Sequence, residues 1–401
     1  MSAGFFIHSF AAQPMTSQSH TALNTLAGAA PAQAGDPLGS IDTPTLVLDL
    51  DAFETNLARM QAWANQHGVG LRAHAKAHKC PQIALRQIEH GAIGICCQKV
   101  SEAVPFVQAG VKDILISNQI VGAPKLALLA ELTRHARVAV CVDNADNLHA
   151  IAQAMQAAGT RIDILVEIDV GQGRCGVNTP ETALALAQQA GTTPGTRFRG
   201  LQAYHGAVQH VREPAARADI CREVAARIRS YVDVLQTAGL AVGTISGAGT
   251  GSAQFDAASG IYTELQAGSY AFMDADYAAN HWQSDLQFEP SLSLLTTVMS
   301  VATPGRAVLD AGLKAMTTES GLPRVMHRPG VTVRQVNDEH TVLVIDGGAS
   351  GEAAVLPALG EKVHLMLPHV DPAFNLHDVV VTVRDGQVTG TWPIEARGPG
   401  R

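Results

Sequence analysis

The sequence predicts an α/β fold in which a (β/α)8 TIM-type barrel is followed by a C-terminal antiparallel β domain. From Thr43 on, apolar β-branched runs of about 4–8 residues alternate with amphipathic stretches of about 10–20 residues, as βα units require. A polar residue follows almost every apolar run, at the end where barrel active sites are assembled. After Asp285 the segments become short and alternating, which predicts the β domain.

The first part of the chain contains an entry strand, a helix and then the barrel strands. The entry strand is expected at Thr45–Leu50, and the helix at Ala52–His67 with Asp51 as its N-cap. Eight further strands are expected at Leu71–Ala75, Ile93–Cys97, Asp113–Ser117, Val138–Asp143, Ile162–Asp169, Phe198–His205, Val242–Ser246 and Glu264–Tyr270.

Helical sequence separates most of these strands. The clearest segments are Pro124–Arg134, Asn144–Ala158, Glu181–Ala190 and Glu213–Ala238. Eight parallel strands can close into a barrel or form an open doubly wound sheet. The barrel is favoured because polar residues gather at one end of the strands. These residues are Lys76, Gln98, Lys99, Asn118, Asp143, Arg174, His205, Thr250 and Ser269.

The segments after residue 285 alternate with Gly, Pro, Asp and Asn, as in an antiparallel β module. They are Leu294–Val301, Arg306–Asp310, Val331–Val336, Thr341–Ile345, Lys362–Pro368, Val379–Arg384 and Gln387–Trp392. The first forty residues are rich in Ala, Gln, Ser, Thr, Gly and Pro with little periodicity. We therefore expect a mobile tail over 1–40, the barrel over 41–285 and the β domain over 286–401.

Composition excludes several classes of function. The 401 residues are 46% hydrophobic and 16% charged, and no apolar run approaches the length needed to span a bilayer. The net charge of −8 argues against a nucleic-acid or anionic-membrane partner. The six cysteines show no zinc-type pairing, and no export signal is visible. Free thiols in a reducing cytoplasm are therefore expected.

Lys76 is the candidate nucleophile. In Leu71–Cys80, an apolar run ends in two histidines and two lysines. Desolvation at the carboxyl end of a barrel strand lowers the pKa of an ammonium, and a neutral amine forms a Schiff base with a carbonyl compound. A solvated surface turn is the alternative when this stretch is considered alone.

Two small-residue turns indicate a phosphate site at the barrel mouth, the end of the barrel where the strands have their carboxyl ends and where Lys76 is expected. Gly247–Ser252 follows the seventh strand with Thr250 as a hydroxyl donor, and Gly268 with Ser269 ends the eighth. A Schiff-base lysine beside a phosphate site suggests pyridoxal 5'-phosphate. Arg174 lies on the glycine-rich loop 171–176, within reach of the cofactor ring or else solvated.

A divalent ion is indicated in the β domain. His369 and Asp371 face the same side if the chain is extended there, and mixed N and O ligands favour Mn²⁺, with Mg²⁺ or Co²⁺ as alternatives. Tyr204 and His205 end the sixth strand. His205 is a candidate general base or a core-edge histidine, and Tyr204 is assigned to the cofactor site.

Several strings together resemble the D-threonine aldolases, which belong to the alanine-racemase-like pyridoxal-phosphate enzymes. They are His74-Ala-Lys-Ala-His-Lys, Cys96-Cys-Gln-Lys-Val-Ser-Glu, Gly171-Gln-Gly-Arg-Cys-Gly-Val, Leu201-Gln-Ala-Tyr-His-Gly, Gly268-Ser-Tyr-Ala-Phe-Met-Asp-Ala-Asp-Tyr and His369-Val-Asp-Pro-Ala-Phe-Asn-Leu-His-Asp. The resemblance runs from about Gly35 to Arg401.

The resemblance implies roles for individual residues. Lys76 matches the Schiff-base lysine, and His369 and Asp371 match the metal ligands. The residues matching the cofactor site, mainly its phosphate part, are Gln98, Thr250, Gly268, Ser269 and Tyr277. One departure is Ala248, where a third glycine is expected in the phosphate loop. A methyl group there requires a negative φ.

The implied reaction is the retro-aldol cleavage of D-β-hydroxy-α-amino acids, such as D-threonine to glycine and acetaldehyde. The ion would bind the β-hydroxyl, and His205 or a water on the ion would remove its proton. A 3-hydroxy-D-aspartate aldolase stays open, since Arg72, Lys79, Lys99 and Lys314 are unassigned cations for a second carboxylate. A D-serine-type dehydratase is less favoured, because the resembling dehydratases pair histidine with cysteine. A non-catalytic cofactor carrier would lack the β domain.

Lys76 and the ion ligands belong to different expected domains, so an intrachain or intersubunit contact must join them. The resemblance favours a homodimer with active sites at the subunit interface.

Overall fold

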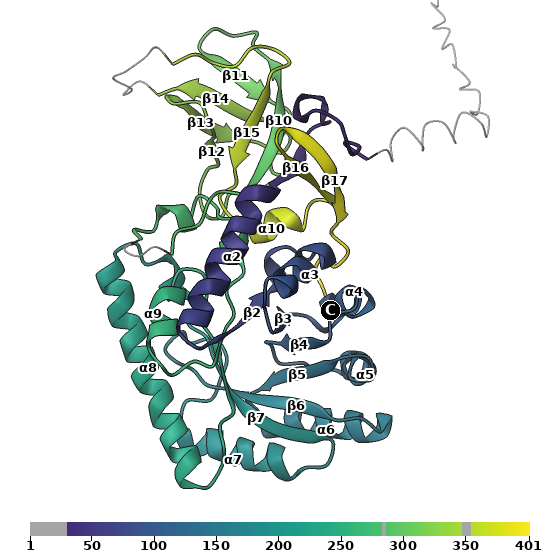
Figure 1. Ribbon diagram of the computed structural model, residues 1–401, viewed down its shortest axis with the longest axis vertical. Helices are drawn as coiled ribbons and strands as arrows, with labels where there is room; N and C mark the ends of the chain where they lie inside the picture. The colour runs from purple at the N-terminus through teal and green to yellow at the C-terminus, as the bar shows by residue number, and fades with distance from the viewer. Residues whose placement is uncertain (1–29, 283–285, 347–353) are drawn as a thin grey trace, which may run out of the picture.

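The computed structural model describes residues 30–282, 286–346 and 354–401. It confirms the predicted architecture of a closed parallel barrel followed by a mainly antiparallel sheet. Figure 1 shows the barrel in the lower half of the view and the sheet above it. The barrel strands are β2 (Gly70–His74), β3 (Gly94–Cys97), β4 (Asp113–Ile116), β5 (Arg137–Val142), β6 (Ile162–Glu167), β7 (Thr196–Ala203), β8 (Thr244–Gly247) and β9 (Glu264–Leu265).

Helices cover the outside of the barrel, as Figure 1 shows. They are α2 (Leu50–Gln66), α3 (Pro81–Glu89), α4 (Ala103–Gln108), α5 (Ala123–Leu132), α6 (Ala145–Ala158), α7 (Pro180–Thr192), α8 (Pro214–Thr237) and α9 (Ala253–Ala258). Short 3-10 turns are η1 (Leu38–Ser40), η2 (Ala75–Ala77), η3 (Val100–Glu102), η4 (Ala207–His210), η5 (Ser269–Ala271) and η6 (Tyr277–Ala279).

Helix α6 shows why these segments fold as they do. Asn144 accepts the N–H groups of Asp146 and Asn147, and Gly159 ends the helix in the left-handed region. Its buried residues recur at helical spacing; they are Leu148, Ile151, Ala152 and Met155. Helix α2 is capped by Asp49, two residues before the predicted cap Asp51.

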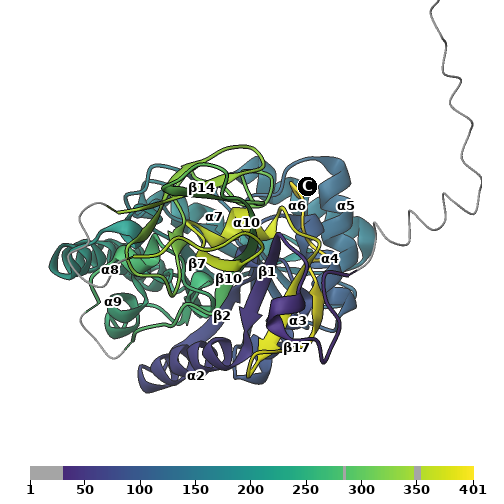
Figure 2. The ribbon, with the colours of Figure 1, turned by 90° about the horizontal axis from the view of Figure 1, so that it is seen from above.

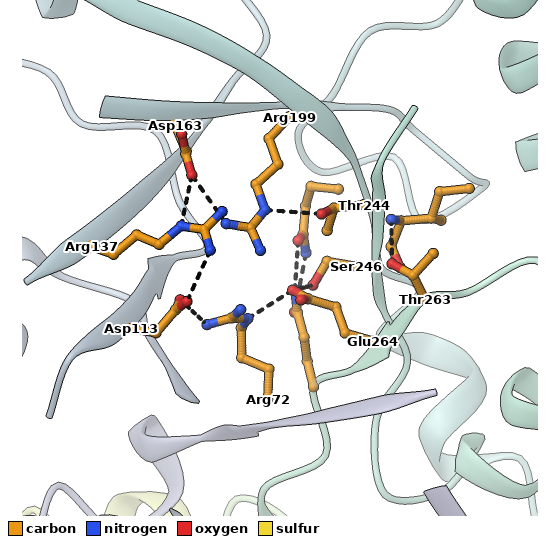
Figure 3. Close-up of polar contacts among 12 residues, drawn as sticks. Arg72, Asp113, Arg137, Asp163, Arg199, Thr244, Ser246, Thr263 and Glu264 are labelled. Atoms are coloured by element: carbon orange, nitrogen blue, oxygen red, sulfur yellow. Dashed lines mark hydrogen bonds and ion pairs between the residues drawn. The ribbon is translucent and has the colours of Figure 1, made fainter. Parts of the chain in front are cut away.

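A network of ion pairs fills the barrel interior at the amino-terminal end of the strands (Figure 3). Arg72 donates to Asp113 at 2.7 Å and to Glu264 at 2.8 Å. Asp163 accepts from Arg137 at 3.1 Å and from Arg199 at 3.0 Å. These charges are paired and hydrogen-bonded, as buried charges must be. They close the end opposite the mouth, so Arg72 lies in the barrel floor.

The second sheet includes the entry strand β1 (Thr45–Asp49), which pairs with β10 antiparallel and with β16 parallel. Its other strands are β10 (Leu292–Ser300), β11 (Arg306–Leu309), β12 (Arg324–Val325), β13 (Val331–Val336), β14 (Thr341–Ile345), β15 (Lys362–Met366), β16 (Val379–Arg384) and β17 (Gln387–Pro393). The main strand order is β13-β14-β11-β10-β1-β16-β17, and β15 pairs with β10 and β12. The described chain therefore passes through the second sheet before it forms the barrel.

A short helix, α10 (Val370–Phe374), follows β15 and lies between the sheet and the barrel. Figure 2, the view from above, shows α10 over the centre of the molecule.

Part of the predicted mobile tail is ordered against the sheet. Gly35 N–H bonds to the carbonyl of Val388 at 2.9 Å, and Leu38 N–H to that of Gly386 at 3.0 Å. Ala32 is buried in a small cluster of apolar side chains there. The prediction of a tail over 1–40 is therefore corrected for residues 32–40, and residues 1–29 lie outside the described part. In the ranges that the structure describes, no helix combines the length and apolarity needed to cross a membrane.

Candidate active site

The turn that carries Lys76 lies at the carboxyl end of β2, at the barrel mouth. Lys76 occupies the middle of η2, directly after β2 ends at His74. The His74 ring holds this turn, because its Nδ1 accepts the Lys76 N–H at 3.4 Å. Its Nε2 lies 3.1 Å from Gln98 Nε2 and 3.2 Å from Ser117 Oγ, which follow β3 and β4. This buried imidazole therefore connects the ends of three neighbouring strands.

Lys76 contacts the C-terminal part of the chain directly. Its ammonium forms an ion pair with Asp371 Oδ2. Asp371 lies in the first turn of α10, and its Oδ1 is 3.7 Å from His369 Nε2. His369 is the N-cap of α10, so the pair converges at a helix start instead of along the extended chain that the sequence suggests. Lysine, imidazole and carboxylate thus meet within one chain.

The charges at this contact set the pKa values of both partners. Burial lowers the pKa of Lys76, but the Asp371 carboxylate outweighs this effect and the pKa is raised. The expectation of a lowered Lys76 pKa is corrected here, because it did not include the carboxylate. Burial raises the pKa of Asp371, yet the charges of Lys76 and His369 bring it down to about 2. Asp371 is therefore ionised at neutral pH and available to a cation.

Two carboxylates hold the start of α10 in position. Glu319 Oε1 lies 2.8 Å from His369 Nδ1, which leaves Nε2 facing the carboxylate of α10. Asp274 is fully buried. Its Oδ2 accepts the N–H of Val370 at 3.2 Å, and its Oδ1 accepts the N–H of Tyr277 at 2.9 Å. Asp274 therefore links the segment after β9 to the helix that carries the candidate metal ligands.

The two small-residue loops lie against each other and against the Lys76 turn. A Cβ added at Gly268 would be 2.8 Å from the carbonyl oxygen of His74, so glycine permits this close approach. Thr250 Oγ1 accepts the N–H of Tyr270 at 3.0 Å and so joins the loops after β8 and β9. Within the described ranges, the N–H groups of Thr250 and Ser269 have no hydrogen-bond acceptor. They are donors of the kind that a phosphate requires.

Arg174, Tyr204 and Tyr277 surround the same mouth. The Arg174 guanidinium lies 5.5 Å from the centroid of the Tyr204 ring. Burial raises the pKa of Tyr204, and the charges of Lys76 and Arg174 oppose that rise. Burial also raises the pKa of Tyr277, and the neighbouring Tyr204 and Asp371 add to that rise. These three residues therefore share one electrostatic environment with the Lys76 ion pair.

The structure does not bring His205 to this cluster. It lines a cavity of ≈ 360 Å³ with Arg227 of α8, on the outer side of the barrel wall. Burial lowers the pKa of His205, and neither Lys76 nor Asp371 is among the groups that shift it. Its Nδ1 has no partner among the described residues. Tyr204 and His205 directly follow β7, and consecutive residues of an extended chain face opposite sides. Tyr204 therefore faces the mouth and His205 faces away.

Another histidine, His210, lies at the mouth and was not singled out from the sequence. It ends η4, and its ring centroid is 5.4 Å from that of Tyr277. Its Nδ1 is 2.6 Å from Asp276 Oδ2, and Arg212 pairs with the same carboxylate. The sequence signal for His210 was the polar Gln-His-Val-Arg run soon after the sixth barrel strand. Such a run is typical of an ordinary loop, and only the folded barrel brings it to the mouth.

This arrangement fits a carbonyl cofactor that carries a phosphate group and an adjacent divalent ion. A lysine amine and two N–H groups without acceptors lie at one mouth beside aromatic rings. His369 and Asp371 offer one nitrogen and one oxygen donor, which suits Mn²⁺, Mg²⁺ or Co²⁺. No group of three or more His, Cys, Asp or Glu residues in the described ranges is arranged to hold a metal. A two-residue site would leave coordination positions for water and substrate.

Comparison with known families identifies the class of protein. Residues 48–276 match the N-terminal domain of alanine racemase, and residues 291–383 match the putative serine dehydratase domain. The fold is therefore that of the alanine-racemase-like enzymes, a fold that implies pyridoxal phosphate.

Individual relatives specify the family. A D-threonine aldolase of Arthrobacter sp is 60% identical over 368 residues, which are 92% of this chain and 96% of that protein. A 3-hydroxy-D-aspartate aldolase of Paracoccus denitrificans is 43% identical over 377 residues, with the same coverage. The crystal structure of D-threonine aldolase from Filomicrobium marinum is 47% identical, with a TM-score of 0.89 over 92% of this chain and 99% of that one. The chain belongs to the D-threonine aldolase family.

Proposed function

We propose that this protein is an aldehyde-lyase that cleaves D-β-hydroxy-α-amino acids, with D-threonine giving glycine and acetaldehyde. The observation that carries the proposal is the contact between Lys76 and Asp371, with His369 Nε2 3.7 Å from the same carboxylate. It supports the proposal because a lysine amine and an imidazole–carboxylate pair meet at one mouth. D-threonine aldolases that are 60% and 47% identical match 92% of this chain.

Several residues of the mouth would hold the cofactor. Pyridoxal phosphate supplies an electron sink for the pair released when the Cα–Cβ bond breaks. Lys76 would anchor its carbonyl carbon, and the N–H groups of Thr250 and Ser269 would bind its phosphate. The same loops bring Gly268 close to the Lys76 turn, and Tyr277 closes the mouth beside them. Gln98, Arg174 and Tyr204 complete the proposed cofactor site from the opposite side.

His369 and Asp371 would hold the divalent ion, for which Mn²⁺ is our first choice. A bound divalent ion lowers the pKa of the substrate β-hydroxyl. Glu319 keeps Nε2 of His369 turned towards this site. The ion would use the Asp371 carboxylate, which pairs with the Lys76 ammonium in the structure.

A general base must remove the proton of the β-hydroxyl, and the geometry supports His210 over His205. His210 lies at the mouth next to Tyr277, and Asp276 binds its Nδ1. That contact leaves Nε2 available to accept a proton, as in other histidine bases oriented by a carboxylate. His205 faces α8 and would need to turn through the barrel wall.

Two observations favour D-threonine over 3-hydroxy-D-aspartate. A second substrate carboxylate would need a cation, but Arg72 is paired in the barrel floor and Lys79 is paired with Glu102. Lys99 and Lys314 remain as unassigned cations. Identity is also higher to the D-threonine aldolase than to the hydroxyaspartate aldolase. A dehydratase is less favoured because the resembling dehydratases pair their histidine with a cysteine, a softer metal ligand, whereas this chain has Asp371.

We further propose a cytoplasmic homodimer with the active sites near the subunit interface. The six cysteines are free thiols, as is common in a reducing compartment. The dimer is not needed to complete the Lys76, His369 and Asp371 cluster, because these residues meet within one chain.

Product analysis tests the proposed reaction. The purified protein, reconstituted with pyridoxal phosphate and Mn²⁺, is incubated with D-threonine, D-threo- and D-erythro-3-hydroxyaspartate and D-serine. Glycine and acetaldehyde from D-threonine at the highest kcat/KM are expected. Glyoxylate as the preferred co-product would establish the hydroxyaspartate aldolase, and an oxo acid with ammonia would establish a dehydratase.

Lys76→Ala and metal removal separate the two cofactors. Lys76→Ala should lose the visible absorbance band of the protein-bound cofactor, because no amine remains at the anchor. Exhaustive chelation should abolish turnover of the wild type and leave that band unchanged. A band that survives in Lys76→Ala would assign the anchor to another lysine, and turnover after chelation would dismiss the metal.

A further inference from the structure

Gln209 occupies the boundary between the segment after β7 and the glycine-rich loop 247–252. It lies in η4, directly before His210, and its side chain is 1% exposed. The sequence pattern alone gives it no role. A buried amide must satisfy both its oxygen and its nitrogen, so its partners identify what it holds.

The partners of the Gln209 amide lie in the glycine-rich loop. Its Oε1 accepts the N–H groups of Gly251 at 2.9 Å and Ser252 at 3.1 Å. Its Nε2 donates to Ser252 Oγ at 2.8 Å and to the carbonyl of His205 at 3.2 Å. Gln209 is held in turn by Asn280, whose Nδ2 donates to its backbone carbonyl at 2.9 Å. The side chain therefore uses both ends of its amide on this contact.

The glycines of the loop match Gln209 sterically. A Cβ added at Gly249 would lie 2.5 Å from Gln209 Oε1, and one added at Gly251 would lie 2.2 Å from the Gln209 carbonyl oxygen. Both distances are far inside van der Waals contact. The backbone contact requires glycine at position 251, and Gly249 leaves room for the Gln209 amide. This reason differs from the direct phosphate contact that the sequence suggests.

The hydrogen bonds also select which N–H groups remain for a ligand. Gly251 and Ser252 donate to Gln209, and Gly249 donates to Ser252 Oγ at 3.2 Å. Thr250 lies between these residues, and its N–H has no acceptor in the described part of the chain. The bonds of its neighbours to Gln209 and Ser252 therefore leave the Thr250 N–H available to a ligand.

We infer that Gln209 is a positioning residue that shapes the 247–252 loop so that Thr250 binds the cofactor phosphate. This inference deepens the proposed function and rests on its cofactor site. Loss of the Gln209 amide would leave two buried N–H groups without acceptors. The loop would then rearrange, and the contribution of the phosphate to binding would fall.

Comparison of pyridoxal phosphate with pyridoxal isolates that contribution. Apoprotein is titrated with each compound by absorbance. The Kd of pyridoxal divided by the Kd of pyridoxal phosphate is the ratio compared between wild type and variants. Gln209→Met keeps a side chain of similar volume but removes the amide. The ratio should fall by about 10- to 100-fold, which corresponds to the free-energy cost of buried N–H groups without acceptors. The Kd of pyridoxal should change by less than about threefold, since its ring contacts lie elsewhere.

Ser252→Ala and Gln202→Met serve as matched variants. Ser252→Ala removes one acceptor of the same network and should lower the ratio in the same direction by a smaller factor. It tests the inference if Gln209→Met does not fold. Gln202→Met breaks another buried amide contact, with Gln266 in the barrel interior at 2.6 Å, and should leave the ratio unchanged.

The outcomes distinguish the inference from the proposed function. A wild type that binds pyridoxal phosphate no more tightly than pyridoxal would overturn the phosphate site, and with it the role of Gln209. A large wild-type ratio that both loop variants retain would overturn the inference alone. An equal loss of both affinities would also overturn it, because Gln209 would then be a general packing residue.

Discussion

At the scale of single residues, Glu319 shows how an outer side chain orients His369, a proposed metal ligand. His369 has two ring nitrogens, and the contact of Nδ1 with Glu319 at 2.8 Å determines which of them faces Asp371. Carboxylates that bond to metal-binding histidines orient the ring and increase its basicity. Glu319 itself is half exposed, so its removal should leave the fold intact.

We expect Glu319→Gln to weaken Mn²⁺ binding by about 10- to 100-fold, the usual effect of losing such a partner. Free Mn²⁺ is measured by electron paramagnetic resonance during a titration of the cofactor-loaded protein. The cofactor absorbance band should not change. Glu339→Gln is the matched control, because Glu339 is exposed on the loop between β13 and β14. Equal affinity in the two variants would remove Glu319 from the site.

The sequence could predict some of these residues and not others, for physical reasons. The position of Lys76 at the barrel mouth was predictable because the residue directly follows an apolar strand, where the mouth forms. Glu319 reaches a histidine 50 positions later in the chain, and no local period encodes that contact. The sequence placed His205 at the mouth, but its side chain lies towards α8, because the side that it faces depends on the exact residue at which β7 ends.

At the scale of elements, the loop after β8 contains a conformation that we did not expect. The sequence predicts a negative φ at Ala248, the position where the resemblance leads us to expect a glycine. The structure has φ 66° there, in the left-handed region where an L-residue is disfavoured by about 1–2 kcal/mol. The methyl group is nevertheless buried in the main core, so its packing offsets part of the strain.

Ala248→Gly should therefore change the stability of the protein by less than about 1 kcal/mol. Relief of strain opposes the loss of one buried methyl, about 0.8 kcal/mol, and the added freedom of glycine in the unfolded chain. Ala203→Gly is the control, because Ala203 is equally buried at the end of β7 without a positive φ. It should cost about 1–2 kcal/mol. Urea unfolding compares the two, and equal losses would show that Ala248 carries no strain.

Elements with a clear period were predictable, and short elements were not. The eight barrel strands and their helices follow from apolar runs and caps. Helix α10 has only five residues and forms where its start is bonded to Asp274, so its sequence resembles a loop. The pairing of β1 with β10 and β16 was also not predicted, because an alternating pattern indicates a strand but not the strands with which it pairs.

At the scale of the whole molecule, the catalytic proposal depends on how the sheet with α10 is held over the barrel. Lys79 is one of the residues that join them. Its Nζ lies 3.1 Å from Glu102 Oε1 on the barrel side. On the other side it donates to Asn375 Oδ1 at 2.9 Å and to the carbonyl of Gly398 at 2.8 Å. Asn375 follows α10 directly, so this contact fixes the helix that carries Asp371.

We expect Lys79→Met to destabilise the protein without removing the cofactor anchor. The Lys79 and Glu102 side chains are 10% and 5% exposed, and loss of one partner from a buried ion pair costs about 3–5 kcal/mol. The cofactor absorbance band should persist, in contrast to Lys76→Ala, and Mn²⁺ affinity should fall because α10 is less firmly held. Lys125→Met, on the exposed face of α5, is the control for loss of a lysine. If a folded Lys79→Met variant lost the band while Lys76→Ala kept it, Lys79 would be the anchor, and the site would have to be rebuilt on the opposite side of η2.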